Sequence, residues 1–433
     1  MGNQDIYVGL DIGTTSIKVI VAERVQGQLN IIGVGNSRAQ GLSRGVIVDI
    51  DKAASAIRQA VQQASEKASI DINDVVAGVP ATMLQIETVS GMIAVGDQSK
   101  EITADDVKAV ASAALVRNLP PEREILSLTP TEFIVDGFDD IKDPRGMIGV
   151  RLELRGILFT VPKTVLHNTK KAIEKAGLTI RQIVVAPLAE ARVALSDGEA
   201  DFGTVLIDLG GGQSTAAVIH DHKLKLTTLD QEGGDYITKD ISVVLNTGLT
   251  DAEKLKRDYG NADSQAAPEG NQFPVSVVGQ TDPVMVSEHY LSEIIEARLT
   301  QIFTRLNDAL AQSNALDLPG GIVLTGGTAA LPGIEPLASD IFQRNVKRYI
   351  PDQMGMRHPA FTLALGLITY AAEMTDIDIL VSSVLPTPTT SQMTASSDAP
   401  VTKVPSKPSK AEPDPDSERK PSALKRFFGN FFE

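Results

Sequence analysis

Two short stretches of the chain combine a carboxylate with a turn rich in glycine or hydroxyl groups. The first, "YVGLDIGTTSIKVIVAE", runs from Tyr7 to Glu23, and the second, "VLIDLGGGQSTAAVI", runs from 205 to 219. In each, an apolar run ends at an aspartate, Asp11 or Asp208, and a second apolar run follows the turn. Apolar runs joined by such a turn are typical of antiparallel strands, so each stretch predicts a β-hairpin with a carboxylate at its tip.

The turn residues are suited to binding phosphate. Glycine lets the backbone approach a ligand closely, and exposed N–H groups with nearby hydroxyls can surround phosphate oxygens. Carboxylates repel phosphates unless a cation lies between them, so Asp11 and Asp208 predict Mg²⁺, reached through water because this ion dehydrates reluctantly. Lys18 lies just beyond the first turn, where it could meet a β- or γ-phosphate. The other expected phosphate contacts are Gly13, Thr14, Thr15, Ser16, Gly210, Gly211, Gly212, Gln213 and Ser214.

One such hairpin would be weak support for a ligand site, because Asp-Gly turns commonly only connect strands. Two in one chain make a shared function the better interpretation. The chain has neither the Gly-x4-Gly-Lys-Ser/Thr pattern nor a Gly-x-Gly-x-x-Gly pattern after a strand, so the better-known phosphate loops are excluded.

Further glycine pairs indicate where a base and ribose would lie. The stretch "GIVLTGGTAALPGIEPLA", 321–338, is interpreted as a buried strand, a Thr-Gly-Gly turn and the start of a helix. Glu253 and Lys256 lie three residues apart, on one face of a predicted helix, and could grip a ribose and base. An ordinary surface ion pair is the equally weighted alternative for these two. The residues assigned to this part of the site are Gly233, Gly234, Glu253, Lys256, Gly326, Gly327 and Thr328.

Composition limits the class of protein. At 433 residues the chain favours two or more domains, and 42% apolar with 22% charged residues is typical of a globular protein. Short Val/Ile-rich runs alternate with amphipathic helical stretches such as 48–68, which predicts an α/β fold. The net charge of −15 argues against nucleic acid as a partner, and the absence of cysteine excludes disulfides and thiolate metal sites. No signal peptide or membrane-spanning run is expected.

The C-terminal region changes character after Ile379. A stretch rich in Pro, Ser, Thr and charge predicts a disordered linker, because it cannot bury enough apolar surface to offset its ordering entropy. The last residues, "SALKRFFGNFFE", instead hold four of the 12 phenylalanines. As a helix they would form one apolar face flanked by two basic residues, which suits an anchor at an anionic membrane surface. The alternative is a short helix that docks on the protein itself or on a partner. The residues assigned to the anchor are Leu424, Lys425, Arg426, Phe427, Phe428, Phe431 and Phe432.

The order of these features carries a family resemblance. A hairpin, a helix, a second hairpin, a Thr-Gly-Gly segment and a final small-residue helix, "PAFTLALGLITYAAE", resemble the actin, heat-shock chaperone and sugar kinase superfamily. Within it, the chain is similar to the FtsA family, bacterial cell-division actins that tether FtsZ filaments to the membrane. The stretch from Asp139 to Val165 is similar to the end of the insertion domain that this family carries. The resemblance implies an actin-like, two-lobed ATPase fold with ATP and Mg²⁺ in the cleft between lobes.

The same resemblance implies a division of the chain into lobes. It places the first lobe at 1–83 and 163–195, its insertion subdomain at 84–162, the second lobe at 196–226 and 300–382, an outer subdomain at 227–299, the linker at 383–420 and the amphipathic helix at 421–433.

One departure from the family bears on catalysis. In related actins the helix that joins the lobes carries a Gln or Glu that orients the attacking water, and here Ala186 falls at that position in "VAPLAEARVAL". Glu190, one turn later, is the nearby substitute, with Asp208 as the other candidate catalytic residue. Because positioning the nucleophile is a large part of phosphoryl transfer, ATP hydrolysis is expected to be weak.

The resemblance also implies partners and a location. The expected function is a filament-forming adaptor at the cytoplasmic face of the membrane, at the division septum, that binds the FtsZ C-terminal peptide and recruits downstream division proteins. Arg298 and Arg305 are expected to project from a helix and meet the acidic peptide. Pairing with the local Glu293 and Glu296 is the alternative for both arginines.

Two other functions stay open on sequence alone. A small-molecule kinase of the same superfamily would need a carboxylate base over a substrate hydroxyl, and only Asp208 is available. Another actin-like adaptor, of the pilus-assembly type, would share the lobes.

Overall fold

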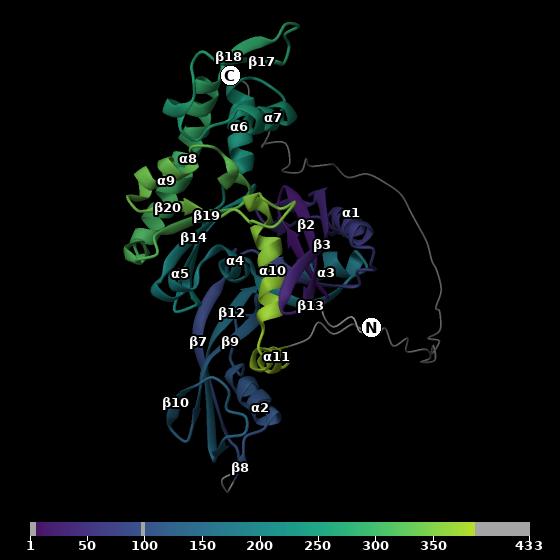
Figure 1. The fold of residues 1–433 in the computed structure, drawn as a ribbon, viewed down its shortest axis with the longest axis vertical. Helices are drawn as coiled ribbons and strands as arrows, with labels where there is room; N and C mark the ends of the chain where they lie inside the picture. Colours follow the sequence, from purple (N-terminus) through teal and green to yellow (C-terminus); the bar gives the residue numbers. More distant parts are fainter. Residues whose placement is uncertain (1–5, 97–99, 386–433) are drawn as a thin grey trace, which may run out of the picture. The chain divides into compact units, whose positions relative to one another are not determined.

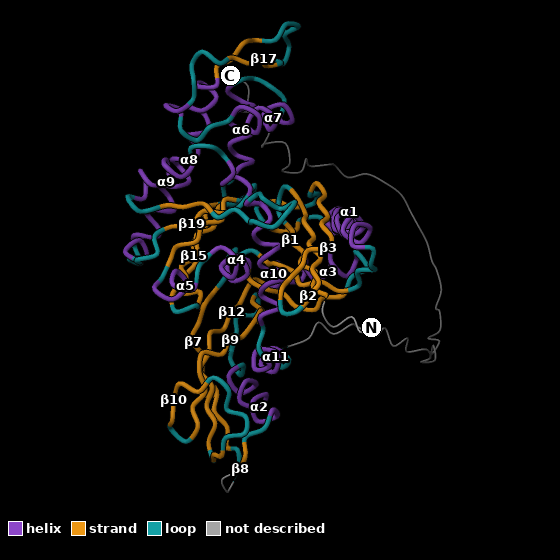
Figure 2. The backbone as a smooth tube through the Cα atoms, viewed as in Figure 1, coloured by secondary structure: helices purple, strands orange, loops and turns teal. Residues whose placement is uncertain are grey.

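The structure, a computed structural model, describes residues 6–96 and 100–385 (Figure 1). Strands and helices alternate along the described chain, which confirms the α/β class (Figure 2). Among the described helices, none combines the length and apolar character needed to cross a membrane. The predicted linker beyond Leu385 and the predicted anchor at 421–433 lie outside the described residues.

Two five-stranded sheets share one topology. In each, three antiparallel strands continue into two parallel strands, with the N-terminal strand of the set at the centre. The first sheet has the order β13 (Thr179–Val185), β6 (Asp74–Val79), β1 (Ile6–Ile12), β2 (Ser16–Val25), β3 (Gln28–Arg38). The second has the order β16 (Lys223–Asp230), β15 (Ser214–His220), β14 (Thr204–Leu209), β19 (Ile322–Thr325), β20 (Val346–Arg348). Both predicted hairpins are therefore present, as β1–β2 and β14–β15.

Helix α1 (Ile50–Ala68) packs on the antiparallel side of the first sheet, beside α3 (Lys163–Lys175). The helix begins two residues later than the sequence pattern suggested, because the Asp49 side chain caps it by accepting from the Lys52 N–H. Glycines in β3 let it lie close, since a Cβ on Gly35 would stand only 1.8 Å from the Ala60 carbonyl oxygen.

Helix α10 (Thr362–Glu373) corrects the expected lobe boundary. The expectation placed 300–382 in the second lobe, but α10 packs against β1, β2 and β6 of the first sheet and crosses α4 (Ala186–Ala194). Close contact makes this possible, because Cβ atoms on Gly9 and Gly366 would clash with α10 and α4 carbonyl oxygens at 2.5 and 2.2 Å. In Figure 1, α10 runs beside the purple β2 strand.

The segment after α10 extends this correction. Helix α11 (Asp376–Ser382) buries Ile377 and Val381 in the core of the insertion subdomain, and Val384 and Leu385 pack against the same core. Residues 384 and 385, beyond the expected linker start at 383, therefore pack with the insertion subdomain. Apolar side chains at 377, 381, 384 and 385 explain this, since they bury surface that the later Pro-rich stretch lacks.

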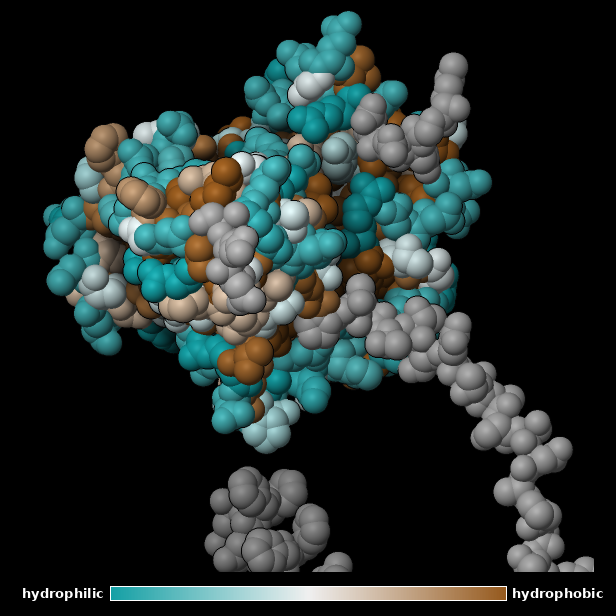
Figure 3. Space-filling model, turned by 90° about the horizontal axis from the view of Figure 1, so that it is seen from below, coloured by the Kyte–Doolittle hydropathy of each residue, from teal (hydrophilic) through white to brown (hydrophobic). Residues whose placement is uncertain are grey.

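The insertion subdomain is a separate four-stranded sheet with α2 (Ala104–Ala114) on one face. Its strand order is β10 (Phe138–Ile141), β9 (Arg123–Val135), β12 (Arg151–Pro162), β7 (Gln85–Ala94), with a short pair β8 (Lys100–Glu101) and β11 (Ile148–Gly149) beside it. On the face seen in Figure 3, brown apolar residues lie in small groups among teal hydrophilic ones.

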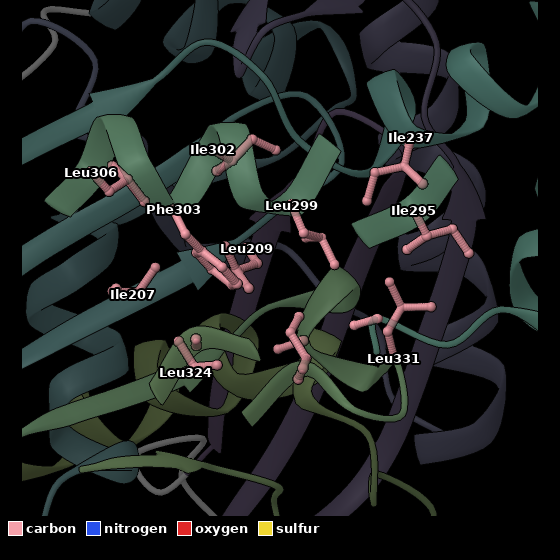
Figure 4. Close-up of a cluster of buried hydrophobic side chains, with 14 of the residues drawn as sticks. Ile207, Leu209, Ile237, Ile295, Leu299, Ile302, Phe303, Leu306, Leu324 and Leu331 are labelled. Atoms are coloured by element: carbon pink, nitrogen blue, oxygen red, sulfur yellow. The ribbon is translucent and has the colours of Figure 1, made fainter. Parts of the chain in front are cut away.

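The long helix α8 (Glu288–Ala311) joins the second sheet to its outer subdomain. Its N-terminal part packs on α6 (Gly234–Val244) and α7 (Leu249–Tyr259), and it also contacts β16 and α9 (Ile334–Phe342). Buried residues at 295, 299, 302, 303 and 306 follow helical spacing and face the strands of the sheet (Figure 4). The expected boundary between 299 and 300 falls inside this helix, and one apolar core continues across it. The remaining elements are β4 (Leu42–Ser43), β5 (Val46–Ile47), α5 (Asp197–Phe202), β17 (Gln272–Val275) and β18 (Val284–Ser287).

Candidate functional site

The tips of the two hairpins line one cleft, with about 900 Å³ of empty space including its open mouth. The expected residues that line it are Asp11, Gly13, Thr14, Thr15, Ser16, Lys18, Glu190, Asp208, Gly210, Gly211, Gly212, Gln213, Gly326 and Gly327.

Asp11 and Lys18 form a buried ion pair on the first hairpin. The antiparallel register of β1 and β2 places them opposite each other, and the Lys18 Nζ lies 3.0 Å from Asp11 Oδ2. The two residues are 5% and 8% exposed. Lys18 therefore neutralises Asp11 in this structure, in addition to any contact it makes with a phosphate.

Asp208 occupies the matching position on the second hairpin but has a different neighbour. The register of β14 and β15 places Thr215 opposite it, and within residues 6–96 and 100–385 it makes no ion pair. Burial, together with the negative charge of Asp11, raises the pKa of Asp208 to about 7, although Lys18 opposes the shift. Among the described residues, the cleft therefore holds one carboxylate in an ion pair and one without an ion-pair partner.

Glu190 is a third carboxyl group at the same cleft. It lies on α4, which joins the two lobes, and is 2% exposed. Burial raises its pKa well above the usual range, and the charges of Asp208 and Asp11 add to the effect. Ala186, four residues earlier, also lines the cleft and presents only a methyl group.

The two hairpin tips fit against each other with small residues facing larger ones. A Cβ on Gly211 would stand 2.4 Å from the Thr15 methyl carbon, and one on Gly212 would stand 2.6 Å from Thr14 Oγ1. Across the cleft, Thr82 Oγ1 donates a hydrogen bond to Gln213 Oε1 at 3.1 Å. The close fit leaves no room for a side chain at either glycine.

Gly326 shows the same constraint on the other side of Asp208. Its φ is +90°, and a Cβ there would stand 2.1 Å from Asp208 Oδ1. Only glycine meets both demands, so the backbone of this turn lies close to the Asp208 carboxylate. Gly326 and Gly327 line the cleft without side chains, which fits a phosphate-bearing ligand.

Ser214 corrects one expectation. It lies within β15, is fully buried, and its Oγ donates to the Glu232 carbonyl oxygen at 2.9 Å. Because side chains alternate along a strand, Ser214 faces away from the cleft while Thr215 lines it.

Gly233, Gly234 and Thr328 support the second hairpin without lining the cleft. The Gly234 N–H and the Thr328 hydroxyl both donate to the Gly210 carbonyl oxygen, at 3.0 and 3.1 Å. Gly233 lies so close that its Cβ would stand 2.5 Å from the same oxygen. These residues position the turn of the second hairpin through contacts outside the cleft.

Glu253 and Lys256 form an ion pair that is more buried than a surface pair. Their charged atoms lie 2.6 Å apart, and Lys256, 9% exposed, also donates to the Gly234 carbonyl and the Thr238 hydroxyl. Burial alone would raise the pKa of Glu253, but Lys256 outweighs it and lowers the pKa. The pair connects α7 to the start of α6, where Gly234 contacts the second hairpin.

Arg298 and Arg305 do not project freely, and their partners are not the expected Glu293 and Glu296. Arg298 donates to Asp240 at 2.6 Å and to Glu232 at 2.7 Å. Arg305 pairs with Asp230 and Glu232, both at 3.0 Å, while its side chain stays half exposed. Their carboxylate partners lie about 60 to 75 residues away in sequence.

Several cleft residues were missed at the sequence level. Gly45, Gly78, Val79, Pro80, Ala81, Pro187, Pro359, Ala360 and Leu363 also line it. A signal was available for the segment after β6, because loops that follow the carboxyl ends of adjacent parallel strands commonly form ligand sites. The others come from distant parts of the chain and carry no local pattern.

The described residues contain no group of three or more acidic or imidazole side chains arranged to hold a metal ion by themselves. Two aspartates on facing hairpins would suffice for Mg²⁺ only if water and phosphate oxygens completed its shell. The donor set therefore fits a metal that arrives with a nucleotide.

Family models match two parts of the chain. "Cell division protein FtsA" matches residues 205–366, and "SHS2 domain inserted in FTSA" matches residues 82–160. Among solved structures, the chain is similar to one titled "PilM-PilN type IV pilus biogenesis complex", with 16% identity, TM-score 0.58 and coverage of 85% of this chain and 99% of that one. It is also similar to "MamK double helical filament", with 13% identity, TM-score 0.52 and coverage of 86% and 99%. At these identities the likeness shows an actin-like fold alone.

Curated relatives are much more similar. The chain is 57% identical over 377 residues to the Enterococcus hirae protein named "Cell division protein FtsA", covering 87% of this chain and 85% of that one. The Bacillus subtilis protein of the same name is 42% identical over 371 residues, covering 86% and 84%. With such identity across most of both chains, and with paired aspartate hairpins in an actin-like fold, this protein belongs to the FtsA family of cell division proteins.

Proposed function

We propose that this protein is an ATP-binding, filament-forming adaptor that tethers the FtsZ ring to the cytoplasmic face of the membrane at the septum and recruits later division proteins. The observation that carries the proposal is the pair of hairpins that bring Asp11 and Asp208 to one glycine-lined cleft. Membership of a cell division family supports the cellular role. It also favours the adaptor over a small-molecule kinase, which would need a sugar or similar substrate to stimulate ATP turnover.

The nucleotide would lie between the hairpins. Backbone N–H groups of the two turns and the hydroxyls of Thr14 and Thr15 would contact phosphate oxygens, and Asp208 would hold Mg²⁺ with Asp11. The metal would supply positive charge between carboxylates and phosphates. Ala186 offers no group to orient water, and the buried Glu190 favours its protonated form, so the chain's own residues support binding better than hydrolysis.

Asp208→Ala tests this site directly. The change removes the carboxylate that lacks a counter-charge, so ATP affinity should fall in Mg²⁺ and should change little in EDTA. Isothermal titration of the full chain with ATP in both buffers gives the comparison. Equal affinity for wild type and variant in Mg²⁺ would remove Asp208 from the metal site.

Membrane attachment would come from the C-terminal segment. Burying a Leu or Phe side chain contributes about 1.5 to 3 kcal/mol and each nearby basic residue about 1 kcal/mol, but interfacial burial is partial and helix ordering opposes it. One tail is therefore a weak, reversible anchor. Head-to-tail polymerisation of the two lobes would present many tails together and multiply the attachment through avidity.

Liposome flotation tests the anchor. Phe428→Glu, or deletion from Ser422 onward, should leave ATP binding intact and release the protein from anionic vesicles. Retained flotation would contradict the assignment. Electron microscopy on an anionic lipid monolayer with ATP tests polymerisation, and monomers at every protein concentration would contradict it.

The FtsZ C-terminal peptide would bind a groove between α6 and α8. Arg298 lines this groove, whereas Arg305 does not. The groove combines apolar Val244 and Ile294 with Arg298, whose position Asp240 sets through two hydrogen bonds. The other lining residues are Asp240, Glu293, Ala297 and Gln301. An apolar wall beside a fixed guanidinium suits a short peptide with apolar and acidic residues.

Ala297→Glu tests the groove more cleanly than Arg298→Glu, which would also place a third carboxylate beside Asp240 and Glu232. The new side chain should fill the groove and repel the peptide, lowering its affinity at least tenfold by fluorescence titration. Ala311→Glu, an exposed position at the end of the same helix, is the matched control. Unchanged peptide affinity in Ala297→Glu would exclude this groove.

A further inference from the structure

A two-residue turn connects the nucleotide cleft to the outer subdomain of the second lobe. Strands β4 and β5 pair Ser43 with Val46, so Arg44 and Gly45 form the turn between them. Both residues have positive φ, +47° for Arg44 and +76° for Gly45. Such a turn favours Asn, Asp or Gly at its first position, and arginine there is strained.

The turn lies against both phosphate hairpins. The Gly45 N–H donates to Thr14 Oγ1 at 2.9 Å, and a Cβ on Gly45 would stand 2.7 Å from Gln213 Oε1. Gly45 therefore contacts the first hairpin and the second at once. Any ligand that changes the spacing of the two hairpins will move this turn or hold it in place.

The Arg44 side chain crosses to the second lobe. Its Nη1 donates to Gln231 Oε1 and its Nη2 to the Tyr236 hydroxyl oxygen, both at 3.0 Å. Tyr236 lies near the start of α6, so these two hydrogen bonds join the first lobe to the outer subdomain of the second. A change in the angle between the lobes would therefore strain or break them.

Tyr236 in turn contacts Arg298, which lines the peptide groove. The guanidinium of Arg298 lies over its ring, 5.8 Å from the centroid, and the same guanidinium is bound by Asp240 and Glu232. Arg44 therefore contacts Tyr236, which lies against Arg298, and Gln231, which precedes Glu232 in the chain. The contacts from Thr14 to the groove wall are continuous.

We infer that Arg44 couples the nucleotide cleft to the groove between α6 and α8, so that nucleotide and acidic peptide each raise the affinity for the other. The inference rests on the proposed function for the identity of the two ligands. Nucleotide in the cleft would hold Arg44 against Tyr236 and Gln231, and these contacts would restrain the Tyr236 ring and Glu232, which position Arg298 at the groove. Linkage makes the effect reciprocal.

Arg44→Asn is the test substitution because asparagine suits this turn type and lacks the guanidinium. Gln26→Asn is its matched control: Gln26 and Gly27 form the same kind of positive-φ turn between β2 and β3, in the same lobe. Peptide affinity is measured on the full chain with and without ATP and Mg²⁺. ATP should tighten peptide binding by about fivefold or more in wild type and Gln26→Asn, within the usual range of allosteric coupling. In Arg44→Asn the ratio should fall close to one.

A second readout separates this inference from the peptide assignment. Amide hydrogen exchange of 291–301 on α8 should slow on addition of ATP and Mg²⁺ in wild type and Gln26→Asn, and should not respond in Arg44→Asn. If no peptide binds, the groove assignment fails and this exchange pattern still supports the coupling. A wild type in which ATP alters neither peptide affinity nor exchange overturns it, as does an Arg44→Asn variant that responds like wild type.

Discussion

The two phosphate hairpins have the same length and topology but opposite electrostatics. Asp11 and its cross-strand partner are seven positions apart in the chain, and so are Asp208 and its cross-strand partner. The partner is Lys18 in the first hairpin and Thr215 in the second. One aspartate is therefore neutralised inside the protein, whereas the other forms no ion pair among the described residues.

This difference shows how a duplicated element can take two roles. The neutralised Asp11 and its lysine make the first hairpin a stable wall of the cleft. The second hairpin keeps an uncompensated carboxylate whose pKa is raised to about 7, mainly by burial and then by Asp11. Such a group favours a cation that arrives with the ligand. Binding of a nucleotide with its cation would therefore remove the unfavourable free energy of a buried carboxylate without an ion-pair partner.

The same substitution should therefore have opposite effects on the two hairpins, with the larger effect in the first. Asp11→Asn leaves Lys18 as a buried cation without a partner, which should lower the free energy of unfolding by about 3 to 5 kcal/mol. Urea denaturation at pH 8 without nucleotide or metal measures it. Glu87→Gln, which breaks the exposed Glu87–Arg117 pair, should cost less than about 1 kcal/mol and serves as the control.

Asp208→Asn should instead stabilise the nucleotide-free protein. The folded-state pKa of Asp208 lies near 7, above the ordinary 3.8, so its ionised form destabilises the fold above about pH 7. One pKa unit corresponds to about 1.4 kcal/mol, and allowing for partial exposure we expect a gain of about 2 to 3 kcal/mol at pH 8. The gain should shrink as the pH falls through 7 and vanish near pH 4. A pH-independent change would contradict this account of the second hairpin.

Ala186→Gln should test whether the cleft lacks a water-orienting group. The longer side chain would supply an amide beside Glu190, so ATP turnover should rise by up to about tenfold while ATP affinity stays unchanged. Single-turnover phosphate release gives the rate. If the wild type already turns over at about 10 s⁻¹, the median for enzymes, slow hydrolysis is wrong and Glu190→Ala becomes the informative variant.

The interlocked hairpin tips should give the smallest effect. Gly211→Ala places a methyl group against the Thr15 methyl carbon and should destabilise the closed cleft by about 1 kcal/mol. Thr15→Ser in the same chain removes the facing methyl and should restore part of the loss, which a double-mutant cycle on ATP affinity measures. Additive effects would mean that the two tips do not meet in the nucleotide-binding state.

Local pattern was sufficient for the elements that carry the site. Each hairpin is encoded within about 17 residues by apolar runs, one aspartate and glycine or hydroxyl residues, and both lie where the pattern predicted. The α/β class followed from alternation of strand and helix patterns. Hairpin register is also local, so the burial of Ser214 and the pairing of Asp11 with Lys18 could have been read from the strand period.

Lobe boundaries were not a local property. The expectation kept α10 and α11 in the second lobe because they follow it in sequence, yet α10 packs on the first sheet and α11 on the insertion subdomain. The partners of Arg298 show the same limit: helical spacing suggested Glu293 or Glu296, and the structure supplies Asp240 and Glu232 from another part of the chain.

The sequence by itself determined the two aspartate hairpins and their glycines, because backbone conformation in a short turn depends on the residues within it. Only the tertiary structure decided which charges meet across the cleft. Arg44 reaching Tyr236, Glu190 joining two aspartates, and Arg298 held by Asp240 all join segments far apart in the chain. Their energies depend on burial and on distances of a few ångströms, which packing of whole lobes sets and no local spacing encodes.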